Sequence, residues 1–209
     1  RFFSLNGHAP VWCMPNAMQP SRMRIPGGWS DDGMPSGVYE SHSERFRPVY
    51  HACSPLPGIH LLPHTTPGLD AIGKRVGQYV RKADRSWQAD CFDHEMTVVL
   101  EAGGALTVIS PCSHAGMINI LKEVCAALPG RPIRSFIGGL HMVTGDSGCA
   151  YSQTEINEMA ACARECGVRT MAVGHCTGAE GYARMAEAFG EKNVQPLTTG
   201  TVLDLSSCL

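Results

Sequence analysis

The sequence predicts a layered α/β domain, and two observations indicate it. From residue 97 onward, short runs rich in β-branched and apolar side chains alternate with runs of helical periodicity, a pattern typical of helices packed on a sheet. The chain has 209 residues, of which 44% are hydrophobic and 17% are charged, so it can bury one sizeable core. We therefore expect a single domain over residues 1–209.

The elements of the second half follow in order. Residues 97–101 and 105–110 are two β-rich runs, and the glycines between them permit the positive φ of a tight hairpin. Apolar side chains then recur at helical spacing over residues 117–128, where a Pro-Gly pair ends the run. The same criteria predict strands over residues 134–137, 170–173 and 194–197, and helices over residues 153–166 and 182–189.

Residues 13–84 differ from the rest in composition. Proline, glycine, serine and methionine are frequent there, and proline disfavours helix interiors and central strands because it lacks a backbone N–H. We expect loops and short strands in this region, which could form a lid.

Charge and hydropathy limit the kinds of molecule that the protein is expected to bind. Seventeen basic and nineteen acidic residues leave a formal net charge of -2, and no block of Lys or Arg could follow a phosphate backbone. The apolar runs are far shorter than the roughly 20 residues of a membrane helix. We predict a cytoplasmic protein that binds neither nucleic acid nor a membrane and acts on a small molecule. The sequence leaves open whether the protein forms a homo-oligomer.

The ten cysteines admit two interpretations. A disulfide framework is typical of small secreted domains, but here the cysteines follow the expected helices and strand ends without regular spacing. Cys162 and Cys166 could be paired, yet their spacing equally suits one face of a helix. We expect reduced, buried thiols.

Three histidines occupy the same place relative to the expected strands. His114, His141 and His175 each follow the carboxyl end of a strand, and neighbouring strand ends converge on one edge of a layered sheet. A single histidine there is more often a hydrogen-bonded structural residue, whereas three indicate a shared site. Imidazole nitrogens suit zinc, iron, manganese or nickel.

Three motifs surround these histidines. They are Cys-Ser-His-Ala-Gly at 112–116, Gly-Gly-Leu-His-Met at 138–142 and Gly-His-Cys-Thr-Gly at 174–178. In this order and spacing they resemble the metallo-β-lactamase superfamily, and most closely its branch of dihydropterin-ribofuranosylaminobenzene 5'-phosphate synthase-like proteins. The resemblance covers most of residues 85–205 and is loose over residues 1–84. It implies an α/β fold, the metallo-β-lactamase-like αββα sandwich.

The resemblance also implies metal ligands. His114 and His175 match the histidines of the third and last ligand motifs. His141 lies where the superfamily usually has a bridging Asp or a Cys, so it is a third ligand, or it instead hydrogen-bonds the substrate or acts as a catalytic proton carrier. The first ligands of the family come from a His-x-His-x-Asp-His motif, which does not occur in this sequence. We therefore expect a sandwich incomplete at its N-terminus and a chain that by itself binds metal weakly and is inactive.

An acidic stretch precedes the central hairpin, where this branch is also acidic. Asp93 is the candidate for a catalytic carboxylate, and Asp90, His94 and Glu95 flank it. The stretch is either a solvated turn or the source of a carboxylate that orients a ligand histidine.

Four other positions within the motifs have two interpretations each. Cys112 and Cys176 are either soft metal ligands or small buried side chains. Thr177 and Gly178 precede the last expected helix, where free N–H groups could bind a phosphate or carboxylate, or merely begin a capped helix.

The histidines and the resemblance together predict a metal-dependent hydrolase. A divalent ion lowers the pKa of its bound water to about 7 and polarises the attacked bond. We expect a small-molecule substrate with an ester, phosphoester or cyclic-phosphate bond. The site should hold one or two divalent ions, most readily zinc, with manganese, iron or magnesium as alternatives. The competing hypothesis is a truncated or degenerate member of the fold that serves as a non-catalytic binding or assembly module.

Overall fold

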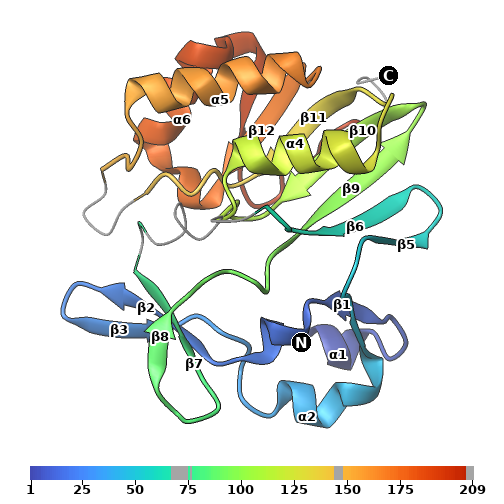
Figure 1. Ribbon diagram of the computed structural model, residues 1–209, viewed down its shortest axis with the longest axis vertical. Coiled ribbons are helices and arrows are strands. Elements are labelled where there is room, and N and C mark those ends of the chain that lie inside the picture. Colours follow the sequence, from blue (N-terminus) through green and yellow to red (C-terminus); the bar gives the residue numbers. More distant parts are fainter. Residues whose placement is uncertain (67–74, 76, 144–147, 206–209) are drawn as a thin grey trace.

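The largest element of the structure is a sheet of seven strands (Figure 1). The computed structural model describes residues 1–66, 75, 77–143 and 148–205. Four strands run parallel, and the other three continue the sheet in antiparallel pairing. In spatial order the strands are β13 (Val194–Leu197), β12 (Thr170–Gly174), β11 (Ile133–Gly138), β10 (Ala105–Ser110), β9 (Met96–Ala102), β6 (Ile59–Pro63) and β5 (Cys53–Leu56).

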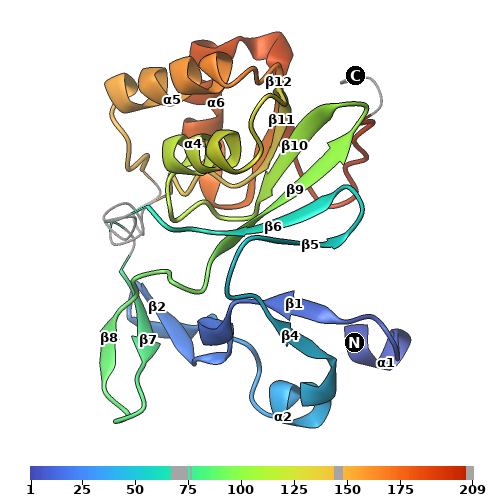
Figure 2. The ribbon, with the colours of Figure 1, turned by 45° about the vertical axis from the view of Figure 1, so that its right-hand side comes forward.

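Three helices connect the parallel strands and cover one face of the sheet (Figures 1 and 2). Parallel neighbours require such crossovers, because a tight turn cannot join them. Of the described helices, none is long and apolar enough to cross a lipid bilayer. The helices are α4 (Met117–Ala127), α5 (Gln153–Glu165) and α6 (Gly178–Phe189).

The core lies between these helices and the sheet. Val108, Phe136 and Met171 are register partners on adjacent strands, and each is at most 1% exposed. They belong to one apolar cluster with Ile120 of α4 and Ile156 of α5. Their burial fixes the relative position of the three strands whose carboxyl ends carry the predicted histidines.

The expected strands and helices after residue 97 are present, with one difference. The helix expected over residues 182–189 begins earlier, at Gly178. Gly181 lies in the added part of the helix and is needed for packing, since a Cβ there would lie 2.8 Å from the Met142 sulfur. The spacing of apolar residues did not predict the first turn of this helix, because its glycines have no side chain that could contribute to such a pattern.

Ser152→Ala should destabilise the protein by about 1 kcal/mol. Ser152 Oγ accepts a hydrogen bond from the Glu155 N–H at 3.3 Å, and the Glu155 carboxylate accepts one from the Ser152 N–H at 2.8 Å, forming a capping box at the start of α5. In the alanine variant the Glu155 N–H has lost the Ser152 hydroxyl that accepts its hydrogen bond. Urea denaturation measures the loss, and Ser152→Thr, which keeps the hydroxyl, should stay close to the native protein. Equal stability of the alanine variant would contradict a stabilising cap.

The N-terminal elements form a region of short strands and helices below the main sheet (Figures 1 and 2). The described residues within 13–84 form short strands, short helices and loops, but β5 and β6 belong to the main sheet, with Pro55 on the edge strand and Pro63 at a strand end. Arg22 lies between the rings of Trp29 and Trp87, 4.0 and 3.9 Å from their centroids. The region contains α1 (Phe2–Leu5), α2 (Val38–His42), the strand pair β1 (Val11–Cys13) and β4 (Phe46–Pro48), and a four-stranded sheet of β3 (Gly28–Asp31), β2 (Ser21–Ile25), β7 (Gln78–Arg81) and β8 (Trp87–Ala89).

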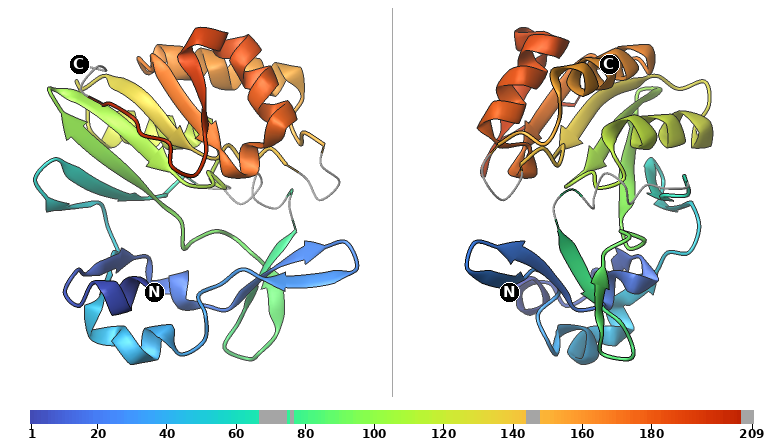
Figure 3. Two further views of the ribbon diagram at one scale, coloured as in Figure 1. Left: turned by 180° about the vertical axis from the view of Figure 1, so that it is seen from behind. Right: turned by 60° about the vertical axis from the view of Figure 1, so that its left-hand side comes forward.

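The second face of the main sheet is also apolar. Val98, Ile109 and Ile137 are register partners that alternate with the core residues and point away from the helices. Residues 198–205 run across this face (Figure 3, left), where Val202 and Leu203 line a hollow together with Ile137. Strands with two apolar faces are typical of a sheet inside a layered fold.

Candidate metal centre

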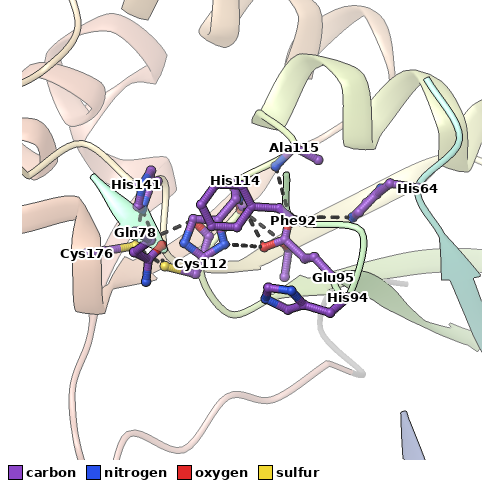
Figure 4. Close-up of polar contacts among 12 residues, drawn as sticks. His64, Gln78, Phe92, His94, Glu95, Cys112, His114, Ala115, His141 and Cys176 are labelled. Carbon is purple, nitrogen blue, oxygen red and sulfur yellow. Dashed lines mark hydrogen bonds and ion pairs between the residues drawn. The ribbon is translucent and has the colours of Figure 1, made fainter. Parts of the chain in front are cut away.

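The three predicted histidines come together at one edge of the main sheet. They follow β10, β11 and β12, which are parallel neighbours, so their carboxyl ends meet there. Ligand atoms of Cys112, His114 and His141 lie within 4.8 Å of one another, and so do those of Cys112, His175 and Cys176. We refer to these five residues as the donor cluster, most of which is visible in Figure 4.

Glu95 fixes the ring of His114. Its Oε1 accepts hydrogen bonds from the ring Nδ1 and from the backbone N–H of His114, both at 3.0 Å, and its Oε2 accepts one from the Ala115 N–H at 2.9 Å. Phe92 stacks on the imidazole, with centroids 4.1 Å apart and planes inclined by 16° (Figure 4). Because a carboxylate can only accept, Nδ1 carries the proton and Nε2 keeps its lone pair for another partner.

His141 lies against His114. Their ring centroids are 4.2 Å apart in a T-shaped contact, and Nδ1 of His141 is 3.5 Å from the Cys112 sulfur. The Nε2 atoms of His114 and His141 are buried and have no hydrogen-bond partner within the described part of the chain. An unpaired buried polar atom costs roughly 1–3 kcal/mol. Because the two rings are in contact, both histidines therefore fit as ligands of a metal ion at this place.

His175 joins the donor cluster through the two thiols. Its Nδ1 lies 3.9 Å from Cys112 Sγ, and the Cys112 thiol donates to Cys176 Sγ at 3.1 Å. Cys176 Sγ also accepts the backbone N–H of His141 at 3.2 Å. His114 and His175, the two ligands predicted first, thus both lie near Cys112, although no close group of donor atoms among the described residues contains both.

The two thiols share one proton. The hydrogen bond from Cys112 lowers the pKa of Cys176 to about 4 against the effect of burial, and His141 and His175 act in the same direction. The same hydrogen bond, together with burial, raises the pKa of Cys112 above its ordinary value. The pair titrates as a unit and carries one negative charge at neutral pH, which favours a bound cation.

Glu95 stays ionised despite its burial. Burial is the largest effect and raises its pKa, but the hydrogen bond and charge of His114, with the N–H groups of Ala115 and His114, outweigh it and lower the pKa below the usual value. A carboxylate behind an imidazole also increases the basicity of the ring, as is typical of metal-ligating histidines.

The backbone at the donor cluster is strained. Ser113, His141 and His175 have φ values of 55°, 51° and 53°, in the left-handed region that favours glycine. Such conformations cost of order 1–3 kcal/mol each and persist where the surroundings over-determine them, commonly at functional sites.

Gly139 allows the loops of the donor cluster to approach one another. A Cβ at this position would lie 2.6 Å from both Cys176 Sγ and the Pro111 carbonyl oxygen. Any larger residue would push apart the loops after β10 and β12, so the motif that precedes His141 needs glycine here.

Thr177 binds neighbouring loops together. Its buried Oγ1 accepts the Leu140 N–H at 3.0 Å, and the carbonyl of Cys176 accepts the N–H groups of Met142 and Val143 at 2.8 and 3.0 Å. The contact with Leu140 gives Thr177 a structural role, although it is not a capping residue, because its side chain makes no cap hydrogen bond at the start of α6.

Of the acidic stretch, Glu95 rather than Asp93 reaches the donor cluster. Asp93 is exposed and accepts a hydrogen bond from Asn16 Nδ2 at 2.7 Å, so its catalytic role stays a prediction. Asp90 is buried and accepts the Phe92 N–H at 2.8 Å, which shapes the turn that places Phe92 on His114.

Behind Glu95 lies a pair that the sequence did not indicate. His64 Nδ1 is 2.7 Å from the Glu123 carboxylate, and His64 Nε2 is 3.8 Å from that of Glu95. Glu123 also accepts the N–H groups of Thr65 and Thr66 at 2.9 and 2.7 Å. Residues 64 and 123 are far apart in the sequence and belong to no motif, so only the fold reveals them.

Comparison with known proteins adds one close match in fold. No family model matches the chain. The 7,8-dihydropterin-6-methyl-4-(beta-D-ribofuranosyl)-aminobenzene-5'-phosphate synthase of Methanocaldococcus jannaschii is 27% identical over 96 residues, which are 46% of this chain and only 30% of that protein. The crystal structure of a metal-dependent hydrolase of the beta-lactamase superfamily has a TM-score of 0.76 at 21% identity, with 95% of this chain and 72% of the other covered.

A metallo-beta-lactamase from Pseudomonas aeruginosa in its mono-zinc form has a TM-score of 0.29 at 9% identity, over 73% of this chain and 50% of the other, which is too low to support an argument. The TM-score of 0.76 shows that the chain has the metallo-β-lactamase fold. This confirms the fold that the three histidine motifs implied.

Proposed function

We propose that the protein is a metal-dependent hydrolase whose one or two metal ions are held by His114, His141 and His175 at the edge of the main sheet. The observation that supports it best is the pair of adjoining histidines, His114 and His141, whose buried Nε2 atoms have no partner among the described residues, next to two thiols joined by a hydrogen bond. Imidazole and thiolate donors suit zinc, with iron as the first alternative, better than magnesium or manganese.

The residues of the chain prepare the site in three ways. Glu95 fixes the tautomer and orientation of His114, Phe92 stacks on one face of that ring, and the ring of His141 is in T-shaped contact with it. A bound ion supplies a water of lowered pKa and polarises the scissile bond. His141 is the candidate to hold or pass a proton, because its ring adjoins the ligand His114.

The proposed substrate is a small molecule with an ester, phosphoester or cyclic-phosphate bond. The name of the Methanocaldococcus relative contains a 5'-phosphate, which supports a phosphorylated compound. The net charge of -2 and the lack of a basic block agree with a small molecule in preference to a nucleic acid.

Metal analysis of the purified protein tests the proposal. Titration of the native protein with zinc or iron should show binding at the site, and His114→Ala and His175→Ala should each lower the affinity for the ion more than tenfold. His60→Ala is the matched control, since His60 pairs with a carboxylate, Glu101, at the same 3.0 Å outside the donor cluster. Unchanged metal content in both site variants would overturn the ligand assignment.

Hydrolysis assays then separate an enzyme from a binding module. Chromogenic esters, phosphomonoesters and phosphodiesters should be turned over by the metal-loaded protein and not after chelation. Stoichiometric metal binding without turnover of any of these would favour the non-catalytic alternative.

A further inference from the structure

The two groups of close donor atoms have one residue in common, Cys112. Its sulfur lies 3.5 Å from Nδ1 of His141, 3.9 Å from Nδ1 of His175 and 3.1 Å from the sulfur of Cys176. The first group consists of Cys112 with His114 and His141, and the second of Cys112 with His175 and Cys176. The Cys112 thiol is therefore close to the donor atoms of all three histidines, His114, His141 and His175, which follow β10, β11 and β12.

We propose that Cys112 is a thiolate ligand shared by two adjoining metal positions, one completed by the imidazoles of His114 and His141 and the other by His175 and Cys176. The proposal rests on the proposed function and adds to it two thiolate ligands and a second metal position.

The donor separations fit coordination. With metal–sulfur bonds of about 2.3 Å and metal–nitrogen bonds of about 2.0–2.1 Å in tetrahedral geometry, sulfur and nitrogen ligands of one ion are about 3.5 Å apart. Cys112 meets this spacing with His141 and lies close to it with His175. The two sulfurs lie 3.1 Å apart, well above the roughly 2.05 Å of a disulfide bond but below the roughly 3.8 Å of two sulfur ligands on one tetrahedral ion, so they would move apart when an ion binds.

The surroundings also hold the sulfurs in place for an ion. Cys176 Sγ is fixed by the N–H of His141, and Gly139 leaves free the volume that a Cβ would take from it. A merely space-filling thiol needs apolar neighbours, whereas Cys112 is surrounded by two imidazoles and a thiol. The second, independent sign of a ligand is the buried Nε2 of His114, which has no partner among the described residues, while His141 would coordinate through the Nδ1 that faces Cys112.

Thiolate ligation has two chemical consequences. A thiol loses its proton when it becomes a metal ligand, so metal uptake should acidify a weakly buffered solution. Soft sulfur also selects zinc, iron or cobalt against magnesium and manganese.

Cobalt(II) titration of the reduced, anaerobic protein tests the proposal. The native protein should develop the near-ultraviolet charge-transfer band of a cobalt–thiolate bond. Cys112→Ser should lose most of this band and bind cobalt at least tenfold more weakly, while Cys176→Ser should keep the part that Cys112 contributes. Cys166→Ser is the matched control, because Cys166 is a half-buried thiol at the end of α5, outside the donor cluster.

The outcomes distinguish the two proposals. Cobalt bound by the native protein without a charge-transfer band, or a Cys112→Ser spectrum equal to the native one, would overturn the shared thiolate and leave the histidine site standing. Failure of the native protein to bind either cobalt or zinc would overturn both. The native spectrum decides the first question even if Cys112→Ser does not fold, and Cys112→Ala provides a second variant.

Discussion

Gly138→Ala is expected to destabilise the protein by about 3 kcal/mol or more. A Cβ at Gly138 would lie 1.8 Å from the carbonyl oxygen of Ser110, and the backbone there has a φ of +147°. Ser110 is the register partner of Gly138 in the β10–β11 ladder, so it cannot move away without breaking the pairing of the two central strands. Urea denaturation with an unchanged slope measures the loss.

The control for this substitution is Gly28→Ala. Gly28 lies at the start of β3, and a Cβ there would meet no atom within 4 Å, so stability should change by only a few tenths of a kcal/mol. A Gly138→Ala variant as stable as the Gly28→Ala variant would show that the two strands are not held as closely as described. The site should suffer too, because Gly138 precedes Gly139 and His141.

Glu95→Gln should weaken binding of zinc or cobalt about 10- to 100-fold. The carboxylate accepts three hydrogen bonds, two from His114 and one from the Ala115 N–H. The amide of glutamine has one oxygen, so a donor of His114 or Ala115 would face an NH2 group, and the imidazole would lose the charge that orients it and increases its basicity. Metal titration followed by competition with a chelator measures the change.

The same variant should alter the dependence of stability on pH. The pKa of Glu95 is lowered in the folded protein, so its contribution is present above the unfolded value of about 4.3 and is lost as pH falls through the folded pKa. Native protein should therefore lose stability below about pH 4.3 more steeply than Glu95→Gln. Denaturation midpoints at a series of acidic pH values give both slopes.

Glu101→Gln is the matched control for both measurements. It removes a carboxylate that is paired with a histidine, His60, at 3.0 Å, but that lies outside the donor cluster. Its metal affinity should equal that of the native protein. Equal losses of affinity in the Glu95 and Glu101 variants would show that the effect reflects net charge and not the contact with His114.

The sequence determined the order of strands and helices after residue 97, because each has a local pattern of apolar residues. It also indicated His114, His141 and His175, since strand ends can be read from the chain and parallel neighbours bring them to one edge. The start of α6 was missed because glycines at 178 and 181 contribute no side chain to a periodic pattern, and their reason lies in the contacts of Val143 and Met142 across the fold.

Only the tertiary structure decided which acidic residue supports the site and how the donors are grouped. Asp93 and Glu95 are equivalent in sequence, but the turn shaped by Asp90 directs Glu95 to His114 and leaves Asp93 to Asn16. Cys112 and Cys176 are 64 positions apart, and their sulfurs meet because β10, β11 and β12 are packed side by side. Local patterns follow from the backbone geometry of a few neighbouring residues, whereas the direction of a side chain at a strand end depends on contacts with distant segments that a single sequence does not reveal.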